Sequence, residues 1–127
     1  MNRQVISPAA GTGSSASPYS PAIRFDNLLF VSGQVALTPA GAISPGGIEE
    51  QTRLVLENLR AILAAGGSSL ERVLKTTCFL TDIDDFAAFN RIYKTFFPLE
   101  PPARSTCQVA GLAPGLLVEI DAIAVVD

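Results

Sequence analysis

The sequence predicts an α+β domain in which two helices pack on one face of a β-sheet. Its 127 residues are enough for one hydrophobic core, so we expect residues 1–127 to form a single domain. Two segments carry apolar residues at helical spacing, and several others are apolar runs rich in β-branched residues. They follow one another as strand, helix, strand, helix and a final pair of strands, an order typical of this class.

The first strands are predicted from short apolar runs between irregular segments. Residues 7–21 are rich in Ser, Gly, Ala and Pro, which favours an irregular lead-in. The apolar run at residues 28–32 leads into Gly33 and is typical of a buried strand. Residues 39–47 contain two prolines and three glycines, so a connection rich in turns should follow. Residues 73–80 are apolar and β-branched, and we expect a second strand there.

Two helices are predicted from the period of the apolar residues. The first begins at Ile48, where apolar residues start to recur at steps of three and four, and it ends at the glycine pair that starts with Gly66. The second follows an N-cap at Asp82 or Asp84 and must end before Pro98. Its aromatic residues form one stripe, which consists of Phe86, Phe89, Tyr93 and Phe96.

The last third is predicted to be a hairpin of two strands, residues 103–110 and 116–126, joined by a loop that contains Gly and Pro. Side chains alternate across a strand, so each strand can be sorted by face. One face of the final strand is wholly apolar and should receive the helices, and Glu119 lies on its other face. In the preceding strand, Arg104 and Thr106 share one face.

If the polar faces of these two strands coincide, Arg104 and Glu119 lie together on the side of the sheet without helices. A half-apolar sheet face left bare by its own helices suggests that a partner subunit covers it. A salt bridge between the two residues explains the pair as well, and ion pairs outnumber catalytic pairs in proteins. The same parity turns Cys107 toward the helices, so we expect Cys107, like Cys78, to be a buried inert thiol.

Composition narrows the classes of partner. Apolar residues make up 48 % of the chain and the mean hydropathy is +0.35, so part of the apolar surface is expected at a subunit interface. The net charge is −3 and no cluster of Lys and Arg is present, which argues against nucleic-acid binding and favours a small-molecule partner.

The absence of histidine excludes a His-based catalytic triad and a His metal site, and we expect no metal. The two cysteines match no metal or redox spacing. No segment has the length and apolar character of a signal peptide or a membrane span, so a cytoplasmic location is expected.

Seven segments, in order along nearly the whole chain, carry a recognisable pattern: residues 17–19, 30–34, 73–77, Asp85-Phe86, Asn90, 102–105 and 118–124. The most specific of them are the Pro-Ala-Arg-Ser block at 102–105 and the closing strand. Together they resemble the RidA/YjgF family of reactive intermediate deaminases, also called endoribonuclease L-PSP. The resemblance implies a chorismate-mutase-like fold with a mixed sheet, packed as a homotrimer with ligand pockets at the subunit interfaces. It also implies hydrolysis of enamines and imines, such as 2-aminoacrylate, to 2-keto acids and ammonia without a cofactor.

The resemblance also implies roles for particular residues. Arg104 matches the arginine that grips the substrate carboxylate, and a guanidinium suits this because it binds a carboxylate in a bidentate manner. Glu119 matches the acidic residue that positions or activates water. The positions that match the walls of the pocket are Tyr19, Ser32, Gly33 and Asn90. Asn90 has a structural alternative as a helix residue that ties down a loop.

One position departs from the family pattern, because Thr106 stands where many of these deaminases carry cysteine. Its hydroxyl can still hydrogen-bond ligand or water, so we expect Thr106 to contact the substrate, without any thiol chemistry. This departure keeps open a second function, a non-catalytic regulator that binds small carboxylates. A third, an endoribonuclease or inhibitor of translation, is disfavoured by the acidic charge balance and the lack of a basic patch.

Overall fold

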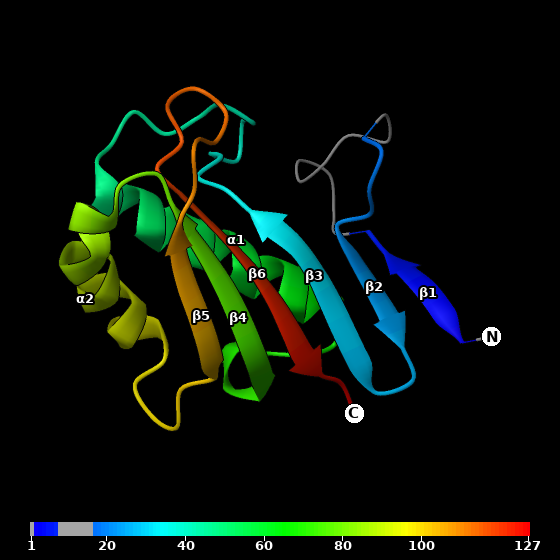
Figure 1. The fold of residues 1–127 in the computed structure, drawn as a ribbon. Helices are drawn as coiled ribbons and strands as arrows, with labels where there is room; N and C mark the ends of the chain where they lie inside the picture. Colours follow the sequence, from blue (N-terminus) through cyan, green and yellow to red (C-terminus); the bar gives the residue numbers. More distant parts are fainter. Residues whose placement is uncertain (1, 8–16) are drawn as a thin grey trace.

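The computed structural model describes residues 2–7 and 17–127. Its elements, in chain order, are β1 (Arg3–Ile6), β2 (Ala22–Phe25), β3 (Leu28–Gln34), α1 (Ile48–Ala65), η1 (Leu70–Arg72), β4 (Val73–Leu80), η2 (Ile83–Asp85), α2 (Phe86–Phe96), β5 (Ala103–Gln108) and β6 (Val118–Val125). The strands form one sheet in the order β1-β2-β3-β6-β4-β5 (Figure 1). The β4–β5 pair is parallel and the other pairs are antiparallel, so the sheet is mixed.

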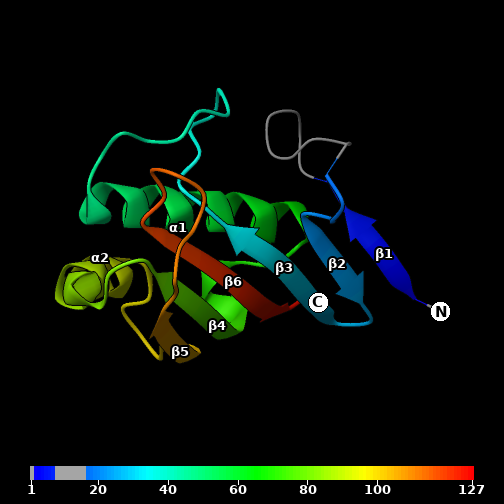
Figure 2. The ribbon, with the colours of Figure 1, turned by 45° about the horizontal axis from the view of Figure 1, so that its top comes forward.

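Both α-helices cover the same face of this sheet, as the sequence predicts (Figures 1 and 2). α1 packs on β3 and β6, and α2 lies beside α1 at the β4–β5 end. The hydrophobic core fills the layer between the helices and the sheet, where every second residue of β6 is buried. The other face of the sheet carries no helix of the described residues, and we call it the open face.

The helix boundaries agree with those predicted from the apolar period. α1 begins at Ile48 and ends just before Gly66, and Gly67 follows with a φ of +84°. The predicted N-cap of the second helix is wrong, because α2 has Asp85 as its N-cap. Asp82 instead caps the short η2 turn that precedes α2, where its side chain accepts a hydrogen bond from the backbone N–H of Asp84. α2 then runs to Phe96 and ends before the proline at 98.

The predicted C-terminal hairpin is wrong. β5 pairs with β4 at the edge of the sheet, whereas β6 lies between β3 and β4. The connection crosses the end of β4, where the N–H of Val109 donates to the carbonyl of Leu80 and the N–H of Thr81 donates to that of Leu117. Because β6 buries a complete apolar face, it gains more from a central place in the sheet than from pairing with its neighbour in sequence.

The N-terminal region also differs from the prediction. β1 and β2 form antiparallel strands at the β3 edge of the sheet, in segments where the sequence predicts none. Residues 17–20 of the predicted lead-in are irregular, and residues 8–16 lie outside the described residues.

Candidate functional site

The strand register places Arg104 on the face of the sheet that the helices cover. Arg104 lies opposite Thr76 in β4, and Thr76 lies opposite Ala122 in β6. Thr76 and Ala122 are both buried beneath the helices. The prediction that Arg104 lies on the open face is therefore wrong. Parity in one strand shows which of its residues share a face, but only the pairing with β4 decides which face that is.

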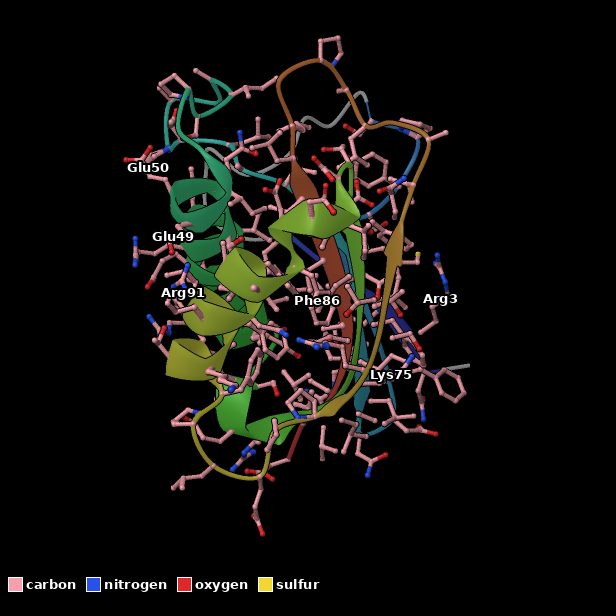
Figure 3. The ribbon with its side chains drawn as sticks, turned by 60° about the vertical axis from the view of Figure 1, so that its left-hand side comes forward. Arg3, Glu49, Glu50, Lys75, Phe86 and Arg91 are labelled. Carbon is pink, nitrogen blue, oxygen red and sulfur yellow. The ribbon has the colours of Figure 1, made fainter. Side chains whose placement is uncertain are left out.

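The guanidinium of Arg104 lies between β5 and α2, against aromatic rings. Its Nη1 donates a hydrogen bond of 2.8 Å to Oδ1 of Asn90. Its Cζ lies 4.7 Å from the ring centroid of Tyr93, 5.5 Å from that of Phe86 and 5.6 Å from that of Phe89. Figure 3 shows Phe86 in the layer between α2 and the sheet, whereas Arg91 and Glu49 form an ion pair on the outside of the helices.

Arg104 is half-buried and forms no ion pair with any residue in the ranges that the structure describes. Asn90 and the aromatic rings around it are all uncharged. A partly desolvated cation without an acidic partner is a favourable place for an anion, because a carboxylate would restore the missing charge and accept the remaining N–H groups.

Thr106 lies on the same face as Arg104, two residues further along β5, and opposite Cys78 of β4. The Thr106 hydroxyl oxygen is buried and has no hydrogen-bond partner among the described residues. Cys78 is buried as predicted, and this burial raises the pKa of its thiol to about 11. The unpartnered hydroxyl of Thr106 is therefore a second polar group available on this face.

Glu119 lies on the open face, as predicted. It is opposite Phe79 in β4, and Phe79 is opposite Cys107 in β5. Cys107 therefore shares the open face and is exposed, so the prediction that it is buried is wrong. Both corrections, of Arg104 and of Cys107, have the same cause, because a reversed assignment of β5 exchanges all of its side chains between the two faces.

Gly33 and Glu119 are in direct contact. β3 has an irregularity in register between Val31 and Gln34, and it brings the backbone of Gly33 against the carboxylate. A Cβ at Gly33 would lie 2.4 Å from Oε2 of Glu119, so only glycine leaves room for this carboxylate position. Burial raises the pKa of Glu119, and the negative charge of Asp121 raises it further.

Tyr19 and Ser32 line one pocket of about 350 Å³ beside the strands β1 to β3. Ser32 is held in place by two hydrogen bonds, from its hydroxyl to the carbonyl of Ser20 at 2.6 Å and from its N–H to that of Pro21 at 3.0 Å. The Tyr19 side chain is 62 % exposed and is free to contact a ligand. The pocket is lined by Arg3, Pro18, Tyr19, Ser20, Ile23, Phe30, Val31 and Ser32.

The predicted site residues thus form two groups on opposite faces of the sheet. Arg104, Asn90 and Thr106 lie on the helix side. Glu119 and Gly33 lie on the open face, and Ser32 precedes Gly33 in the chain. A salt bridge between Arg104 and Glu119 is not formed, and one copy of the chain does not bring them to a common small ligand.

The open face carries exposed apolar side chains. Val5, Phe25 and Phe30 are between 42 % and 48 % exposed, and the strand register places all three on the same side as Glu119. Figure 3 shows Lys75 and Arg3 on this side of the sheet, away from the helices. An exposed apolar surface of this kind on a sheet is typical of a protein interface.

The sequence alone did not reveal the aromatic surroundings of Arg104. Phe86, Phe89 and Tyr93 are recognisable in the sequence as an apolar helical stripe, which indicates core packing. Their contact with a cation follows only from the parallel placement of β5 beside β4.

Two general features of the described residues bear on the class of site. In residues 2–7 and 17–127, no three His, Cys, Asp or Glu side chains gather in a way that could hold a metal ion. The described helices are also too short or too polar to span a membrane.

Comparison with known proteins identifies relatives over nearly the full chain. Residues 12–126 match the family model described as endoribonuclease L-PSP. A mouse protein named 2-iminobutanoate/2-iminopropanoate deaminase is 45 % identical over 124 residues, which cover 97 % of this chain and 91 % of that protein. The human protein of the same name is 41 % identical over 97 % of this chain and 90 % of its own length. A fission yeast protein named mmf2, mitochondrial, is 48 % identical over 87 % of this chain and 90 % of its own length.

Solved structures show the same fold. The structure of Escherichia coli TdcF with bound serine is 38 % identical and superposes with a TM-score of 0.89, covering 98 % of this chain and 99 % of that chain. The structure of YyfA from Yersinia pestis, described as a member of the conserved Rid protein family, is 40 % identical with a TM-score of 0.91, covering 98 % of this chain and 99 % of that chain. The chain therefore belongs to the endoribonuclease L-PSP family, which is also called RidA/YjgF.

Proposed function

We propose that this protein hydrolyses reactive enamines and imines, such as 2-aminoacrylate and 2-iminopropanoate, to 2-keto acids and ammonia. The observation that carries the proposal is Arg104, a half-buried guanidinium that has no acidic partner among the described residues. These substrates all carry a carboxylate next to the reacting carbon. A guanidinium that binds this carboxylate through two parallel hydrogen bonds also fixes where the reacting carbon lies.

The relatives support this choice of substrate. The mouse, rat and human relatives are all named 2-iminobutanoate/2-iminopropanoate deaminase, and the TdcF structure contains serine, which carries an α-carboxylate. Both named substrates are small 2-imino acids. Arg104 meets the requirement that they share, which is a cation for the carboxylate.

We further propose that the active site is completed by a second copy of the chain in a homotrimer. Arg104 and Glu119 lie on opposite faces of one sheet, so they can act on one small substrate only if they come from different subunits. The exposed apolar residues Val5, Phe25 and Phe30 give the open face a surface that a neighbouring subunit can bury.

In this site Glu119 acts on water. The enamine tautomerises to an imine, whose carbon is electrophilic. The Glu119 carboxylate accepts a proton from water as the water oxygen attacks that carbon, and it returns the proton to the nitrogen. The hydroxyl proton of the resulting carbinolamine then moves through Glu119 to the nitrogen, and the C–N bond breaks to give the keto acid and ammonia. A raised pKa suits this role, because it makes the carboxylate a stronger base.

The other predicted site residues bind the substrate. Asn90 orients Arg104, and the unpartnered Thr106 hydroxyl contacts the carboxylate or water. Gly33 leaves room for the Glu119 carboxylate, and Ser32 and Tyr19 line the neighbouring pocket. No cofactor takes part in this proposed reaction. We place the protein in the cytoplasm, although one relative is named mitochondrial.

The test couples the purified protein to a serine dehydratase, which generates 2-aminoacrylate, and follows the release of pyruvate. We expect wild type to accelerate this release, Arg104→Ala to abolish the acceleration, and Arg104→Lys to restore it only in part because lysine lacks the planar fork. Arg60→Ala is the matched control, since Arg60 also lies over an aromatic ring, that of Phe96, at 5.1 Å.

Equal rates with wild type, with Arg104→Ala and without protein would overturn the deaminase proposal. If pyruvate binding depended on Arg104 but release were not accelerated, the non-catalytic regulator would be the correct function. Cross-linking and sedimentation of the wild-type protein test the homotrimer separately, and a monomer that is fully active would exclude a site built between subunits.

A further inference from the structure

We propose that the aromatic face of α2 positions Arg104, with Phe86 and Tyr93 as positioning residues that fix the plane of the guanidinium. In this arrangement the Nε–Nη2 edge of Arg104 faces the substrate carboxylate. The inference rests on the proposed function for the identity of the anion, but its geometric basis is independent of the chemistry that follows.

The first support is the spacing of the rings along the helix. Phe86, Phe89 and Tyr93 recur at steps of three and four, so they project from one side of α2. Their ring centroids all lie within 5.6 Å of the Cζ of Arg104. A guanidinium over an aromatic ring is attracted by the negative face of the ring, and several rings together restrict its tilt.

The second support is the single hydrogen bond that Arg104 makes to a described residue. Asn90 lies on the same side of α2, and its Oδ1 accepts from Nη1 at 2.8 Å. This contact prevents rotation of the guanidinium about its own axis. It leaves the Nε and Nη2 groups, whose parallel N–H bonds match the two oxygens of a carboxylate, without a partner among the described residues.

The third support is that Tyr93 is itself held rigidly. Its hydroxyl forms a 2.7 Å hydrogen bond with the Thr76 hydroxyl, and both residues are at most 5 % exposed. Its ring also packs against those of Phe89 and Phe97, at centroid distances of 5.5 and 4.7 Å. Thr76 is also the register partner of Arg104 in β5. The same residue of β4 therefore lies beside the Arg104 backbone and holds the Tyr93 ring by a hydrogen bond.

A purely structural role for these rings predicts a different outcome from a positioning role. Phe96 provides the comparison, because it lies on the same helix, is half-buried like Phe86, and has the guanidinium of Arg60 over its ring at 5.1 Å. Substituting Phe96→Leu or Phe86→Leu removes one half-buried ring from α2 beneath a guanidinium. Only Phe86→Leu removes a ring that contacts Arg104.

The experiment measures pyruvate binding and turnover for Phe86→Leu, Tyr93→Leu, Tyr93→Phe and the control Phe96→Leu. For Phe86→Leu and Tyr93→Leu, we expect the pyruvate Kd and the KM to rise about threefold to thirtyfold, with kcat changed by less than about twofold. Arg104 binds the carboxylate equally in the ground state and the transition state. A weaker hold on the carboxylate therefore raises KM and leaves kcat unchanged. Tyr93→Phe retains the ring and should change the Kd less than Tyr93→Leu does.

A spectroscopic readout tests the geometry without reference to catalysis. The rings should displace the NMR resonance of the Arg104 Nε–H group through their ring currents. We expect Phe86→Leu to reduce this displacement and Phe96→Leu to leave it unchanged. Because Phe86 is only half-buried, the Phe86→Leu variant should remain folded if Tyr93→Leu does not.

The outcomes separate this inference from the proposed function. If wild type is active and Arg104-dependent, but Phe86→Leu and Phe96→Leu raise the KM equally or leave the Nε–H resonance in place, the positioning role is wrong. If the resonance responds as expected while wild type shows no turnover, the positioning role stands and the deaminase proposal fails.

Discussion

The contact between Gly33 and Glu119 allows the proposed base to be displaced by one methyl group. A Cβ at Gly33 would lie 2.4 Å from Oε2, 2.8 Å from Cδ and 3.0 Å from Cγ of Glu119. Since non-bonded carbon and oxygen atoms stay more than about 3 Å apart, Gly33→Ala must move the Glu119 carboxylate by about 1 Å. The change therefore acts on the position of one side chain.

The magnitudes follow from this displacement. A misplacement of about 1 Å lowers a rate roughly 100-fold when it affects a group that must hold a reacting water, so kcat/KM should fall by about that factor. The loss of stability should be small, about 1 kcal/mol, because the end of a Glu side chain can move to another rotamer. Gly33 does not have a φ in the left-handed region, so alanine adds no backbone strain there.

The assay compares the kcat/KM for imine hydrolysis and the Tm of Gly33→Ala with those of Gly67→Ala. Gly67 has a φ of +84°, so alanine there strains the backbone and should lower Tm without changing kcat/KM. Gly33→Ala should therefore lower kcat/KM with little change in Tm, whereas Gly67→Ala should lower Tm with little change in kcat/KM. If Gly33→Ala retained kcat/KM within about threefold of wild type, Glu119 would not be the base in the position seen here.

Three further predictions concern pH, stability and thiol reactivity. Asp121→Asn removes a negative charge that raises the pKa of Glu119, so the loss of kcat/KM on acidification should begin at lower pH, and an unshifted profile would contradict this. Gln51→Leu removes a buried amide that hydrogen-bonds backbone groups just before β6 and just before α1. Urea unfolding should show a loss of about 2–4 kcal/mol, and a loss below about 1 kcal/mol would contradict the role of these bonds. In a Cys107→Ser variant, Cys78 should not react with a thiol reagent until the protein unfolds, because burial raises the pKa of Cys78 to about 11; rapid reaction in the native state would contradict this.

The sequence predicted those elements that depend on neighbours along the chain. α1 begins and ends where the apolar period and the glycine pair place it, and β4 has its predicted bounds. The position of α2 before Pro98 was predictable for the same reason. Helical spacing and capping are local properties, and the residues that produce them are all within a few positions of one another.

The pairing of the last strands depended on contacts far apart in the sequence. β5 and β6 are separated by a short connection that resembles a hairpin loop, but β6 lies between β3 and β4 because its buried face needs neighbours on both sides. The wrong pairing led to the prediction of the wrong sheet face for both Arg104 and Cys107. The error is therefore a single one, about which strand lies next to β5.

The sequence by itself thus predicted Arg104 and Glu119 as candidate site residues, through the resemblance carried by two short segments. Only the tertiary structure decided that they lie on opposite faces of one sheet, because strand faces are set by register with β4. The same register surrounds Arg104 with aromatic rings and places Gly33 against Glu119. The residue types of the site are a property of the sequence, whereas their arrangement depends on long-range pairing that no local pattern records.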